Sequence, residues 1–140
     1  MSLEEDVYAY LAADTILATL LGATAIDAKI YPLFAPTETG GLPHIVYSSP
    51  GEGSPDELLD GMRLTFKITT DNDYEQANAI KEQLNKLLDF KQSQKNLNIP
   101  SSDFNIYDSQ KNGKTDDYDK EAKLVIKVLN YDIKYITKTF

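Results

Sequence analysis

The clearest hydrophobic pattern in the chain lies between Asp73 and Phe90. Apolar residues recur there three or four positions apart, so that they fall on one side of a helix. Asp73 and Gln76 also have the spacing of a capping box, in which side chains satisfy free N–H groups at the start of a helix. The pattern predicts an amphipathic helix over about residues 73–90, with an apolar stripe formed by Ala77, Ile80, Leu84, Leu87 and Leu88.

A second helical pattern lies near the N-terminus. A capping-box pattern opens at Ser2, and the apolar residues that follow recur at helical spacing. Asp14 is placed to cap a further short turn, which Gly22 would end. We therefore expect one helix from about Leu3 to Leu21, bent near Asp14.

Three strands are predicted between these helices. Lys29–Tyr31 and Pro43–Ser48 are rich in β-branched and aromatic residues. Gly61–Thr70 alternates cleanly between apolar and polar residues, as is typical of a half-buried antiparallel strand. The connecting segments Ala35–Leu42 and Ser49–Asp60 are rich in Pro, Gly, Ser and acidic residues, so we expect exposed loops there.

Two further strands are predicted after the polar connection Lys91–Ser102. Phe104–Ser109 alternates, Asn112 and Gly113 suit a tight turn, and a loop is expected through Thr115–Asp119. The order of elements is therefore helix, three strands, helix, two strands. Bunched strands favour the α+β class, with an antiparallel sheet of about four or five strands and the 73–90 helix packed on one face. We expect a single domain over residues 1–140.

The last segment carries an unusual pattern. Its apolar residues occupy even positions from Ala122 and odd positions from Leu129. A strand cannot change phase without an extra residue, so we predict a β-bulge or bend near Val128–Asn130. The run Glu121–Lys138 would span about 55–60 Å if straight, and strands rarely exceed about 10 residues. It should bend across the domain or extend onto another chain.

Composition limits the range of functions. The chain has 140 residues, with 14 Lys and Arg against 22 Asp and Glu, a net charge of −8. This balance argues against nonspecific binding to DNA, RNA or anionic lipid. The absence of cysteine excludes disulfides and thiolate metal sites, and the single histidine, His44, excludes multi-histidine sites. The sequence also has no apolar run of about 20 residues and no basic leader, so we expect a cytoplasmic protein.

Two acidic clusters are candidates for metal binding, and they leave a small metal-assisted hydrolase as an alternative function. In the first cluster, Gln76 stands where a calcium loop needs glycine, and helix capping explains acids at that place. The second cluster could hold Ca²⁺ or Mg²⁺ weakly, but such runs are usually solvated loops. The clusters are Asp71, Asp73 and Glu75, and Asp116, Asp117 and Asp119.

Other chemical signals are weaker. His44 has no serine or aspartate partner at a recognisable spacing, and Gly51–Pro55 lacks the lysine of a phosphate loop. We therefore expect no enzymatic activity, no cofactor and no metal. A basic concentration in the last segment is read either as a charged outer strand face or as a face that meets acidic loops of a neighbouring subunit. It consists of Lys120, Lys123, Lys127, Lys134 and Lys138.

The order of landmarks resembles a family. The landmarks are the N-terminal helix, Ile30–Pro32, Leu42–Tyr47, the alternating strand that leads into Thr70–Ala77, and the closing Tyr131–Tyr135. Together they resemble the small phage tail-completion proteins, of the tail-terminator type that caps the tail tube and joins it to the head. The resemblance implies an α+β subunit without catalytic residues, located in the virion tail and, during assembly, in the host cytoplasm.

The resemblance also implies partners. Such a subunit assembles into a ring, commonly a hexamer, and contacts the tail-tube protein and the head–tail connector protein of a phage or prophage. DNA would pass through the ring, and the net charge of −8 would repel its phosphates. Another head–tail adaptor or a minor tail component is the alternative role.

The predicted contact between subunits lies on the long terminal strand. A closed ring needs two different surfaces that fit each other, and a strand with a second apolar face could supply one of them. The candidate interface residues are Leu129, Tyr131, Ile133 and Tyr135, with residues 129–140 as an intersubunit arm.

Overall fold

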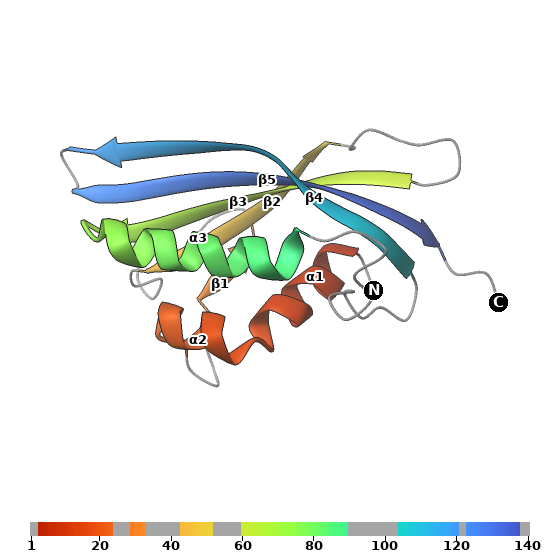
Figure 1. Cartoon of the computed structure of the whole chain (residues 1–140), viewed down its shortest axis with the longest axis horizontal. Coiled ribbons are helices and arrows are strands. Elements are labelled where there is room, and N and C mark those ends of the chain that lie inside the picture. The colour runs from red at the N-terminus through yellow and green to blue at the C-terminus, as the bar shows by residue number, and fades with distance from the viewer. Residues whose placement is uncertain are drawn as a thin grey trace.

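The computed structural model describes residues 3–23, 29–32, 43–51, 60–89, 104–120 and 123–137. Within these ranges, three helices lie against one face of a five-stranded sheet (Figure 1). This is the predicted α+β class, with the first helix divided in two. None of the described helices is both long and apolar enough to cross a membrane. The elements are α1 (Leu3–Ala12), α2 (Thr15–Leu21), β1 (Ile30–Pro32), β2 (His44–Gly51), β3 (Asp60–Asp71), α3 (Tyr74–Leu88), β4 (Phe104–Asp119) and β5 (Leu124–Thr137).

The sheet is mixed, whereas the sequence predicted a wholly antiparallel one. Its order is β1-β2-β3-β5-β4, and β1 pairs with β2 in parallel while the other neighbouring strands are antiparallel. An alternating pattern identifies a strand and its buried face, but it is the same whichever way the neighbouring strand runs. The order also places the last strand, β5, between β3 and β4.

The predicted helix caps at Asp14 and Asp73 are confirmed. The Asp14 carboxylate accepts a hydrogen bond from the N–H of Leu17 at 2.8 Å, and this cap separates α2 from α1. Gly22 ends α2 in the left-handed conformation, at φ 66°. The cap predicted at Ser2 and the connection Lys91–Ser102 lie outside the described residues.

The core lies between the helix layer and the sheet. The inward face predicted for β3 is confirmed, because its three central apolar side chains are fully buried. Tyr131 of β5 packs edge-on against Phe66, with ring centroids 5.8 Å apart, and its hydroxyl donates to the Asn85 side chain on α3. The buried cluster draws on both layers and includes Leu11, Leu17, Leu64, Phe66, Ile68, Ile80, Leu84, Leu88, Leu129, Tyr131 and Ile133.

β4 is longer than predicted. The expected turn at Asn112 and Gly113 is wrong, because β4 continues through Asp119 and pairs with β5 along its length. The register shifts between Lys111 and Lys114, so that Asn112 and Gly113 stand opposite Asn130 alone. Gly113, at φ 108°, instead supplies the unusual backbone conformation of a β-bulge. The predicted acidic loop is therefore part of a strand.

β5 contains no change of phase, so the bulge predicted near Val128–Asn130 is wrong for this strand. Its pairing with β3 is unbroken from Asp60 opposite Tyr135 to Asp71 opposite Leu124. The odd positions of β5 face the helices throughout, and the even positions face away. The strand does not leave the domain within the described residues, since its own chain pairs with both of its edges.

Candidate interaction surface

One face of the sheet has no helix on it. The helices α1, α2 and α3 all lie on the other side (Figure 1), and no described element covers the face that we call the helix-free face. Side chains at registered positions of neighbouring strands share a face of the sheet. The register therefore assigns side chains from β1, β2, β3, β5 and β4 to this face. It falls into a polar part and an apolar part.

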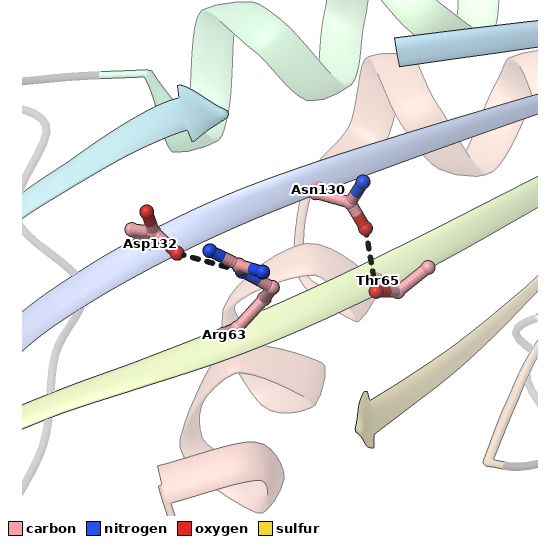
Figure 2. Close-up of polar contacts among 4 residues, drawn as sticks. All are labelled: Arg63, Thr65, Asn130 and Asp132. Atoms are coloured by element: carbon pink, nitrogen blue, oxygen red, sulfur yellow. Dashed lines mark hydrogen bonds and ion pairs between the residues drawn. The ribbon is translucent and has the colours of Figure 1, made fainter. Parts of the chain in front are cut away.

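The polar part consists of two cross-strand pairs between β3 and β5. Figure 2 shows Arg63 beside Asp132 and Thr65 beside Asn130. The Arg63 Nε donates to Asp132 Oδ1 at 3.1 Å, and the Thr65 hydroxyl donates to Asn130 Oδ1 at 2.6 Å. Because these pairs satisfy one another within the chain, this part of the face is ordered and polar, with little demand for an outside partner.

The apolar part lies toward the other end of the same strands. We call it the apolar patch. Its members are half-buried in the single chain, although they lie opposite the helices. The buried Thr69, 4% exposed, stands between His44 on β2 and Ile126 on β5. The patch consists of Tyr31, Val46, Leu124, Ile126 and Val128.

Exposed charged residues lie within and beside the patch, and they are Lys67 and Asp71 on β3 and Asp117 on β4. Lys67 of β3 stands in register between Val46 and Val128, and its side chain makes no hydrogen bond or ion pair with the described residues. Asp117 of β4 is in register with Ile126, and its Oδ1 accepts from the Tyr118 N–H at 2.8 Å. An apolar area bordered by charges is typical of surfaces that bind other proteins.

The sequence-predicted interface residues have another role in this structure. Leu129, Tyr131 and Ile133 are 0% exposed beneath the helices, and Tyr135 packs against the same core. In this conformation the first three are inaccessible to a second copy, because they already form the subunit's own core. Residues 138–140, the end of the predicted arm, lie outside the described residues.

The acidic candidates for metal binding do not converge. Asp73 is engaged as the cap of α3, where it accepts from the Gln76 N–H at 2.9 Å. Asp116 and Asp117 are neighbours on a strand, so their side chains point to opposite faces of the sheet. Within the described part of the chain, no group of three His, Cys, Asp or Glu residues could hold a metal ion.

Lys127 is the residue that sequence reasoning misplaced most. It was assigned to a charged outer face, but it is 1% exposed on the helix side. Its Nζ lies 3.1 Å from Asp116 Oδ1 and 4.4 Å from the centre of the Tyr74 ring. The Tyr74 hydroxyl contacts Asp116 Oδ2 at 3.4 Å and completes the group. The sequence did carry one indication of this burial. Alternate residues of a strand share a face, so Lys127 lies on the same face as Val125 and Leu129.

The remaining candidates are placed without a catalytic arrangement. His44 is half-buried on the helix-free face, with its ring 6.1 Å from that of Tyr31 in an edge-on contact. Gly51 ends β2, and the rest of the glycine-rich segment is outside the described residues. Lys120 and Lys123 are exposed beside the turn between β4 and β5, and Lys134 is half-buried on the helix-free face.

The comparison with known proteins identifies a solved structure that shares the fold of this chain. No protein-family model matches the sequence, and no curated protein matches it. Among solved structures, the chain is similar to a chain in the virion of a native gene transfer agent (GTA) particle, with a TM-score of 0.68 and 17% sequence identity. The alignment covers 98% of this chain and 96% of that chain. At this identity the similarity establishes a shared fold over nearly the whole of both chains.

Proposed function

We propose that this chain is a structural protein of a phage-like virion, which caps the tail tube, stops its polymerisation and forms the interface to the head connector. The observation that carries the proposal is the fold shared end to end with a chain of a gene transfer agent virion. The order of sequence landmarks, which resembles tail-terminator proteins, supports the capping role in particular.

The proposed mechanism is geometric. A ring of subunits, commonly six in the family that the sequence resembles, would match the last layer of the tail tube on one side and the head connector on the other. A closed ring requires each subunit to present two different surfaces that fit each other. Growth would stop because the ring's outer side offers no copy of the surface that a further tube layer needs.

The long strand pairings and the contacts between α3 and the sheet suit a structural role. β3 and β5 pair over their full common length, and β4 continues the sheet beyond them. The Lys127–Tyr74 contact and the Tyr131–Asn85 hydrogen bond join α3 to the sheet at separate points. A net charge of −8 would disfavour adhesion of DNA that passes through the ring.

The test is deletion of the gene from the phage or prophage that encodes it. Without a cap, tube polymerisation has no fixed end, so we expect electron micrographs of lysates to show tails of irregular length and heads without tails. Supplying the wild-type gene from a plasmid should restore uniform, head-attached tails.

Three outcomes would contradict the capping role. Normal tails attached to normal heads would remove the chain from tail assembly altogether. Tails of uniform, normal length that fail to join heads would indicate the alternative role of a head–tail adaptor, while a defect confined to the far tip would indicate a minor tail component.

A further inference from the structure

We draw no further inference here: the strongest candidate, the apolar patch on the helix-free face of the sheet, carries none because nothing in the described part of the chain shows what covers it.

Discussion

Lys127 occupies a core position on β5 although its side chain carries a charge. Its stem lies in the row of buried side chains formed by Val125 and Leu129, and its ammonium reaches the half-exposed Asp116 at 3.1 Å. A buried charge is tolerated when it is paired, and the Tyr74 ring adds a further favourable contact. The sequence indicated the position but not the partner, because Asp116 and Tyr74 reach Lys127 only through tertiary contacts.

This arrangement predicts an asymmetry between two substitutions. Asp116→Asn should lower the free energy of unfolding by about 1–2 kcal/mol, because it leaves a buried ammonium with a weaker partner. Lys127→Met should be close to neutral, since it removes the charge and keeps the volume. Urea unfolding measures both, with Asp117→Asn on the opposite face as control. A larger loss for Lys127→Met than for Asp116→Asn would contradict this assignment.

The buried phenol of Tyr131 should make the free energy of unfolding fall at high pH. Burial raises the pKa of its phenol above the ordinary value of 10.0, and the Asp89 carboxylate raises it further. The folded chain therefore keeps this proton at a pH where the unfolded chain loses it. Its contribution to stability is complete below about pH 10 and is lost progressively as the pH rises above that value.

The matching variant is Tyr131→Phe. At neutral pH it should cost about 1 kcal/mol, because the hydroxyl no longer donates to Asn85. The difference in unfolding free energy between wild type and variant should narrow above about pH 10, since only the wild type loses stability through this phenol. Urea titrations at several pH values measure it, and a gap that widens with rising pH would show that the sign is wrong.

At the scale of elements, local patterns were informative where one face of an element is buried. The alternation of Gly61–Thr70 and the helical stripe of residues 73–90 each predicted an element and its inward face. β5 was misread because its first half is apolar on both faces, with Val125 inside and Ile126 and Val128 outside. The pattern resembled a change of phase, whereas it marks a second face that is available for contact.

The pairing of β4 with β5 is irregular at two places, and Gly113 lies at the second, between Lys111 and Lys114. Only glycine adopts φ 108° without strain, so Gly113→Ala should lower the free energy of unfolding by about 1–2 kcal/mol. An added Cβ would meet Asn130 Nδ2 at 3.7 Å, an ordinary contact, so the cost belongs to the backbone rather than to a clash. Lys111→Ala, exposed on the same strand, is the control for urea unfolding. Equal effects of the two substitutions would argue against a backbone requirement at Gly113.

At the scale of the whole molecule, the relations between elements were the hardest to predict. The parallel pairing of β1 with β2 and the central place of β5 depend on how distant segments meet, which no local period encodes. For the same reason, Leu129, Tyr131 and Ile133 were assigned to an interface between subunits. A strand of apolar residues fits a neighbouring chain or its own helices equally well, and here α3 and its neighbours cover it.

In the proposed function, this chain acts by its shape as a part of a virion tail. Electron cryomicroscopy of intact particles from the encoding phage or prophage tests that role. We expect density for this five-stranded sheet and its helices in a closed ring at the head-proximal end of the tail tube. Particles that assemble with complete tails and lack this chain, or that carry it only at the distal tip, would refute the proposed function.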